Sequence, residues 1–189
     1  MSELAQNIIP DTWIYNRFGS KTGLMRYAQH ESLRLLGAYR RFKPSKLEPP
    51  KRLVFVCMGN ICRSPLGEAV ARQMGVEATS YGLSTRGNDP ADPRAAQFAQ
   101  QENYDLSQHR TRPIEQYSPT AGDWLVCMEP KQAYRLYRMY SATPIALLGL
   151  YGTSTRAYIH DPFNTNAAYF EHCEQLVVHA TRALVQHVT

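Results

Sequence analysis

The sequence predicts an α/β fold: a four-stranded parallel sheet flanked by helices on both faces, with a helical extension at the N-terminus. Short apolar runs alternate with longer segments of helical periodicity, and this order favours parallel strands joined by right-handed crossovers. The first apolar run, residues 53–56, ends at a cysteine followed by a tight loop and a helix start. Because ligands of such sheets lie at the carboxyl ends of the strands, we expect the functional site there.

Each element follows from a local pattern. We expect strands at residues 53–56, 77–81, 123–128 and 144–148, and helices at 64–74, 93–102, 130–140 and 165–187. Prolines open the second and third helices, at Pro93 and Pro130, where a proline is tolerated. The last helix carries an apolar stripe at helical spacing, which predicts a buried face: Phe170, Cys173, Val177, Ala180 and Leu184.

The first fifty residues form an extension of different character. Residues 43–51 are Pro-rich and polar, typical of a linker, so we divide the chain into an extension, 1–50, and a main domain, 51–189. Residues 8–18 are rich in aromatic residues and are expected to dock on another surface. Residues 22–42 predict a basic amphipathic helix whose apolar face packs on the main domain or on a second copy, or lies on an anionic membrane. Its apolar residues are Met25, Ala28, Leu35, Leu36 and Tyr39.

Charge and cysteine content narrow the class of protein. The net charge is +5, but residues 1–52 hold ten basic and four acidic residues, so the excess lies in the extension. These basic residues match no nucleic-acid-reading motif, and we expect no nucleic-acid partner. Four cysteines without paired spacing do not suggest a disulfide scaffold. With no signal peptide pattern and no long apolar run, a cytoplasmic protein is expected.

Residues 57–65, Cys-Met-Gly-Asn-Ile-Cys-Arg-Ser-Pro, predict an oxyanion-binding loop with a sulfur nucleophile, Cys57. Backbone N–H groups of the loop and of the following helix start form an anion nest, and Arg63 adds a fork that matches phosphate. The same positive field predicts a lowered pKa for the Cys57 thiol. Gly59 and Asn60 suit a left-handed backbone, while Ser64 suits an N-cap. The loop residues are Met58, Gly59, Asn60, Ile61 and Cys62.

The string at 56–65 resembles the signature loop of the low-molecular-weight protein tyrosine phosphatases. Further matches follow in the family's order at 80–83, 92–95, 105–112, 127–129 and 161–163, so the resemblance covers residue 52 to the C-terminus. It implies hydrolysis of phosphotyrosine through a cysteinyl-phosphate on Cys57, with no metal and no cofactor. Asp161, followed by Pro162, is then the general acid and base. The Ser64 hydroxyl either assists the Cys57 sulfur or only caps the helix, and the resemblance favours assistance.

The resemblance also implies supporting roles. Asn60, Ser80 and His109 match positions that brace the loop, and Cys62 matches a thiol that forms a reversible disulfide with Cys57. Cys127 and Cys173 are expected in the core, and His160 at the surface. Glu129 stands where the family usually has aspartate, and the effect of this difference on the site is left open.

Two departures from the family pattern concern the substrate. The loop 83–89 lacks the aromatic residue with which many members grip the substrate ring, and Arg86 lies near that place. The acid loop keeps one aromatic residue, Phe163, and continues with Asn164. This pattern is closer to bacterial members that act on tyrosine kinases of exopolysaccharide export. The expected partner is therefore a phosphotyrosine protein such as a tyrosine autokinase.

Two other functions remain open at this point. Thiol-dependent arsenate reductase shares this fold and loop but relays electrons through two further neighbouring cysteines, and Cys127 has no such neighbour. A docking module that binds phosphate without turning it over would keep the loop and act through the basic extension. Intact Cys57, Arg63 and Asp161 argue against that second alternative.

Overall fold

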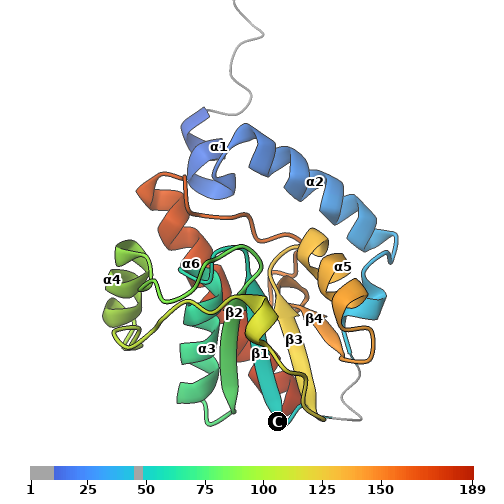
Figure 1. Cartoon of the computed structure of the whole chain (residues 1–189). Coiled ribbons are helices and arrows are strands. Elements are labelled where there is room, and N and C mark those ends of the chain that lie inside the picture. Colours follow the sequence, from blue (N-terminus) through green and yellow to red (C-terminus); the bar gives the residue numbers. More distant parts are fainter. Residues whose placement is uncertain (1–10, 45–48) are drawn as a thin grey trace, which may run out of the picture.

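The computed structural model describes residues 11–44 and 49–189. The first ten residues and part of the Pro-rich linker, 45–48, lie outside the described residues. Within the described chain, four parallel strands form one sheet in the order β2-β1-β3-β4 (Figure 1). They are β1 Arg52–Cys57, β2 Ala78–Gly82, β3 Asp123–Cys127 and β4 Ile145–Leu147. The expected parallel sheet is confirmed.

Strand β1 lies in the middle of the sheet and is buried on both faces, as its unbroken apolar run predicts. Its neighbours are β2 on one side and β3 on the other, with Val54 opposite Thr79 and Leu125. The chain leaves β1 toward β2 and later returns to β3, so the strand order reverses beside β1. Cys57, the last residue of β1, therefore lies at the point where such sheets bind ligands.

Helices cover both faces of the sheet. They are α3 Arg63–Gln73, α4 Pro93–Gln101, α5 Pro130–Met139 and α6 Ala167–Val188. Helices α3 and α6 pack against each other, whereas α5 packs on β3 and β4 (Figure 1). A Cβ at Gly67 would lie 2.6 Å from the Phe55 ring, so glycine allows α3 to approach β1 closely. The apolar stripe of the last helix is buried, as expected.

The extension forms two helices where the sequence predicts one. Helix α1, Asp11–Phe18, packs on α6, and α2, Lys21–Leu35, follows after a short turn (Figure 1). Ser20 caps α2 by accepting a hydrogen bond from the Gly23 amide at 2.8 Å. The predicted helix over 22–42 ends early because Gly37 adopts a φ of 82°, and the chain continues as a 3₁₀ turn at Arg40–Phe42.

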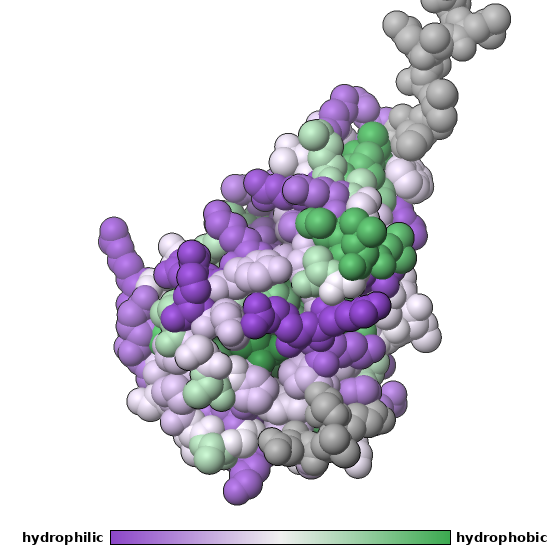
Figure 2. All heavy atoms as spheres, turned by 90° about the vertical axis from the view of Figure 1, so that its right-hand side faces the viewer, coloured by the Kyte–Doolittle hydropathy of each residue, from purple (hydrophilic) through white to green (hydrophobic). Residues whose placement is uncertain are grey.

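The orientation of α2 contradicts the expected packing of its apolar face on the main domain. Met25, Leu35 and Leu36 are 72%, 75% and 83% exposed, and only Tyr39 of the predicted face is buried. Figure 2 shows apolar side chains gathered on this side of the molecule. The opposite face of α2 meets polar groups of the main domain, which require hydrogen-bonding partners when they are covered. The same face also carries Leu33, which packs against the core, so polar and apolar contacts together hold the helix.

None of the helices in the described parts of the chain is long and apolar enough to cross a membrane.

Candidate active site

The loop after β1 is built around Asn60. This residue adopts a left-handed backbone with a φ of 58°, as expected, whereas Gly59 does not. The Asn60 side chain donates to Ser64 Oγ and Ser80 Oγ, both at 2.9 Å, and accepts from the Arg112 amide at 2.9 Å. The backbone amide of Asn60 donates to Cys57 Sγ at 3.3 Å. One buried side chain thus links the loop to β2 and to a distant segment.

The start of α3 differs from the sequence prediction in a way that bears on catalysis. The helix begins at Arg63, with Cys62 in the N-cap position and no side chain capping it. Ser64 therefore lies inside the first turn rather than at the cap. Its hydroxyl lies 3.0 Å from Cys57 Sγ. Because no side chain caps the helix, its first N–H groups can hold an anion beside the sulfur.

A second layer of polar residues supports the loop from behind. Ser80 donates to Glu68 at 2.7 Å, and His109 Nε2 lies 2.7 Å from the Asn60 carbonyl oxygen. Burial lowers the pKa of His109, although the hydrogen bond to Asn60 opposes the shift. The neutral ring must carry its proton on Nε2, because a carbonyl oxygen only accepts. Glu68 was not anticipated, since a glutamate within a helix gives no sequence signal for this contact.

Arg63 is enclosed by two carboxylates. It is 1% exposed, and one terminal nitrogen donates to Glu129 at 2.8 Å and to the Ile159 carbonyl at 3.0 Å. The other terminal nitrogen lies 2.7 Å from Asp161 Oδ2. Burial by itself would lower the pKa of Arg63, but Asp161 and Glu129 raise it well above its usual value. Glu129, whose effect the sequence left open, is therefore a partner of the buried guanidinium.

Cys57, Arg63 and Asp161 open onto one cavity of about 240 Å³. Phe163, 51% exposed, and Met58, 37% exposed, provide large apolar surface at its edge. Arg86 is exposed and does not line this cavity, so a role in substrate contact stays a prediction. The lining residues are Cys57, Met58, Gly59, Ile61, Cys62, Arg63, Asp161 and Phe163.

The four cysteines fall into two pairs by location. Cys57 and Cys62 line the cavity, and all four thiols are free. Burial raises the pKa of Cys62, so it remains a thiol beside Cys57. A disulfide between these two residues stays a prediction. Cys127 and Cys173 are fully buried, as expected for core residues.

The geometry suits chemistry at a phosphorus centre. A sulfur at the end of a strand faces an uncapped helix, and a guanidinium and a carboxylate lie at the same cavity. In the described residues, no three His, Cys, Asp or Glu side chains gather as a metal site. Such an arrangement can hold a phosphate group, attack it with sulfur and supply a proton to the leaving oxygen.

Comparison with known proteins assigns the class. The sequence model of the family described as low molecular weight phosphotyrosine protein phosphatase matches residues 52–189. The chain belongs to this family. It is a protein-tyrosine phosphatase and hence a phosphoric monoester hydrolase. The match leaves α1 and α2 outside the family's shared part.

Individual relatives come from bacteria and animals. The chain is 28% identical over 140 residues to a probable low molecular weight protein-tyrosine-phosphatase EpsP of Ralstonia nicotianae, which covers 73% of this chain and 96% of that protein. It is 30% identical over 153 residues to the human low molecular weight phosphotyrosine protein phosphatase, and the match covers 72% of this chain and 94% of the human protein. The tyrosine phosphatase Wzb from Escherichia coli K30, solved with sulphate, superposes with a TM-score of 0.64 at 25% identity over 74% of this chain and 99% of that one.

Proposed function

We propose that this enzyme hydrolyses phosphotyrosine and related aryl phosphate monoesters through a cysteinyl-phosphate on Cys57, with Asp161 as general acid and base. The observation that carries this proposal is the convergence of Cys57, Arg63 and Asp161 on one cavity. The three residues are far apart in sequence or on different elements. Catalysis requires the sulfur, the guanidinium and the carboxyl group within reach of one phosphate. Catalysis would thus lie in residues 51–189.

In the first step, the Cys57 sulfur attacks phosphorus, and the bond from phosphorus to the aryl oxygen breaks. The loop amides and Arg63 hold the phosphoryl oxygens, where charge stabilisation contributes most. Arg63 Nε is buried and has no protein partner among the described residues, while the neighbouring terminal nitrogen contacts Asp161. An arriving phosphate would take both nitrogens as a bidentate fork and release the Asp161 carboxylate. Away from the guanidinium, Asp161 would take up a proton from solvent and deliver it to the leaving oxygen.

In the second step, water attacks phosphorus, the sulfur–phosphorus bond breaks, and inorganic phosphate leaves. Asp161, now ionised, accepts the proton from water, which restores the acid for the next cycle. Ser64 lies 3.0 Å from Cys57 Sγ and can donate a hydrogen bond to the departing sulfur. Asn60, Ser80 and His109 hold the loop in the conformation that presents its amides.

The cavity edge supports an aryl substrate. Phe163 and Met58 offer exposed apolar surface next to the site, where the ring of a phosphotyrosine would pack. A related Wzb from Vibrio vulnificus, 25% identical, was solved with benzylphosphonate. That complex supports an aryl phosphate substrate for this chain. The resemblance to bacterial members supports a phosphotyrosine protein such as a tyrosine autokinase as the substrate.

The first experiment is hydrolysis of 4-nitrophenyl phosphate under reducing conditions. We expect Cys57→Ser to abolish turnover, because no sulfur remains to form the covalent intermediate. We expect Asp161→Ala to lower kcat by about 10²-fold or more, because 4-nitrophenolate leaves without a proton but hydrolysis of the cysteinyl-phosphate still needs Asp161 as the base. Inhibition by inorganic phosphate should persist in Asp161→Ala, since the loop and Arg63 remain.

Glu102→Ala is the control for that experiment, because it removes an exposed carboxylate that does not line the cavity. Turnover that persists in Cys57→Ser would contradict the proposal. No turnover of any aryl phosphate by the wild-type enzyme would do so as well.

A further inference from the structure

We propose that helices α1 and α2 of the extension position the loop that carries the general acid, Asp161. They do so through contacts with Ala157, Tyr158 and His160, which precede the acid in this loop. The inference rests on the role proposed above for Asp161. The family match begins at residue 52, so these helices are an addition to the shared fold. They contact the segment from residue 157 to residue 166, which surrounds Asp161 in the sequence.

The first contact fixes the start of this segment. The Ala157 amide donates to Glu31 Oε1 at 2.9 Å, and both Ala157 and Tyr158 are buried. Glu31 Oε2 is itself held by Arg34 Nε at 2.7 Å, which orients the carboxylate. A side chain of α2 therefore satisfies a buried backbone donor only four residues before the acid.

The second contact is a directed chain of hydrogen bonds. A terminal nitrogen of Arg26 donates to the Tyr158 hydroxyl at 3.4 Å, and that hydroxyl lies 2.7 Å from His160 Nδ1. Because arginine only donates, the tyrosine oxygen accepts from Arg26, which leaves the hydroxyl proton free for His160 Nδ1. Burial lowers the pKa of His160, which agrees with a neutral ring that accepts at Nδ1. The chain ends on the residue next to Asp161.

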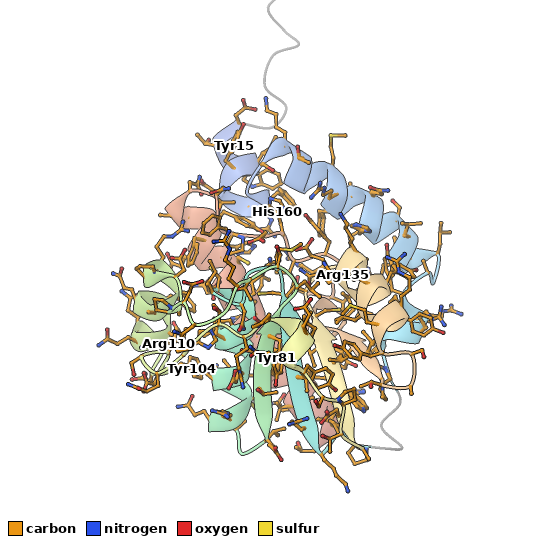
Figure 3. All side chains as sticks on the ribbon, viewed as in Figure 1. Tyr15, Tyr81, Tyr104, Arg110, Arg135 and His160 are labelled. Carbon is orange, nitrogen blue, oxygen red and sulfur yellow. The ribbon has the colours of Figure 1, made fainter. Side chains whose placement is uncertain are left out.

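The third contact is close packing against His160. A Cβ at Gly19 would lie 2.8 Å from His160 Cδ2, and one at Gly23 would lie 3.1 Å from the same atom. The turn between α1 and α2 thus rests on the imidazole ring, and only glycine leaves room for it. Figure 3 shows His160 directly beneath these helices. Beyond the acid, the Asn166 side chain donates to Asn16 at 2.8 Å.

The other side of this segment is tied to the catalytic groups. The Ile159 carbonyl accepts from Arg63, and its amide donates to the Met128 carbonyl at 3.0 Å. Residues 157–160 are therefore held between the extension and the guanidinium that contacts Asp161. A carboxylate on a segment held from both sides is oriented before the substrate arrives, which lowers the entropic cost of proton transfer. We infer that the extension preorganises the acid.

The test uses the full chain and two substrates that differ in their need for a proton. Phenyl phosphate releases a basic phenolate and needs the acid, whereas 4-nitrophenyl phosphate releases a stable anion. We expect Glu31→Ala and Tyr158→Phe to lower kcat/KM for phenyl phosphate by about tenfold and for 4-nitrophenyl phosphate by less than about twofold. Glu31→Gln should restore most of the loss, because its amide oxygen still accepts from Ala157.

The control is Met25→Gln, which changes an exposed residue of the same helix and should leave both values unchanged. Tyr158→Phe keeps the ring and loses only the hydroxyl, so it provides the answer if Glu31→Ala fails to fold. Equal losses on both substrates, or no loss on either, would overturn the inference while the proposed function stands. A wild-type enzyme inactive on both substrates would instead overturn the proposed function.

Discussion

The buried guanidinium of Arg63 illustrates how single residues set the chemistry of this site. Glu129 and the Ile159 carbonyl hold one terminal nitrogen, and Asp161 holds the other. Removing a charge from water is costly unless partners surround it, and here two carboxylates supply them. Substrate phosphate would replace one of these partners, Asp161, and so couple binding to release of the acid. Glu129 is not displaced in this scheme and keeps the arginine in place.

Ser64 provides the prediction at this scale. Its hydroxyl contacts Cys57 Sγ at 3.0 Å and accepts from Asn60 at 2.9 Å. We expect Ser64→Ala to lower kcat by about tenfold to a hundredfold, since a hydrogen bond to a charged group contributes about 1.5–3 kcal/mol. Pre-steady-state kinetics with 4-nitrophenyl phosphate would locate the loss. A slower second step, seen as a larger burst of nitrophenol, supports a role in release of the sulfur; an unchanged kcat would show that the serine is only structural.

Helix α2 shows that an element can follow its sequence pattern and still be oriented against it. The apolar positions lie on one side of the helix, as predicted, but that side faces away from the main domain. The inward side carries Arg26, Glu31 and Tyr27, which meet Tyr158, the Ala157 amide and Arg156. Of the aromatic segment in α1, Phe18 is buried against Tyr27, whereas Trp13 and Tyr15 remain partly exposed.

The exposed side of α2 leads to a prediction about stability. We expect the double substitution Leu35→Gln and Leu36→Gln to change the free energy of unfolding by no more than about 0.5 kcal/mol per site, the range of ordinary surface positions. Thermal unfolding of both proteins at equal concentration is the measurement. A lower Tm of the variant, with a deficit that shrinks as both proteins are diluted, would show that the face is covered by a second copy in the wild type.

At the scale of the whole molecule, α6 packs against α3 and places a carboxyl group inside the core. Glu174 is fully buried, and neither of its oxygens has a hydrogen-bond partner among the described residues. Burial raises its pKa from 4.5 to about 8. The protonated acid is therefore the form that the folded core accepts at neutral pH, and ionisation of this group opposes folding.

The consequence is a pH-dependent stability. Glu174 is protonated in both states below pH 4.5, but between pH 4.5 and about 8 only the unfolded state ionises it, so stability falls as the pH rises. One pKa unit corresponds to about 1.36 kcal/mol, so the total loss is several kcal/mol. We expect the Tm of Glu174→Gln, which cannot ionise, to rise relative to that of the wild type by about 8–16 °C as the pH goes from 5 to 8.5. A difference in Tm that is constant with pH would contradict this prediction.

The fold and the central part of the site could be predicted from local sequence because their physical causes are local. A buried apolar run makes β1, and the residues after Cys57 can form only a narrow set of loops. Contacts between distant segments could not be predicted in this way. Neither Glu68 behind Ser80 nor Glu129 against Arg63 has a neighbour in the sequence that signals its partner. His160, expected at the surface, lies half-buried under the extension.

The sequence by itself determined the parallel sheet and the loop that follows Cys57, and it led to the proposal that Cys57 is the nucleophile, Arg63 the phosphate-binding arginine and Asp161 the acid. Periodicity, turn propensity and functional-group chemistry depend on a few neighbouring residues, so they can be recognised in the sequence alone. Only the tertiary structure decided that Cys62, and not Ser64, occupies the N-cap of α3, and that α2 turns its polar side inward. Both outcomes depend on satisfying buried polar groups across long sequence separations, which no local pattern records.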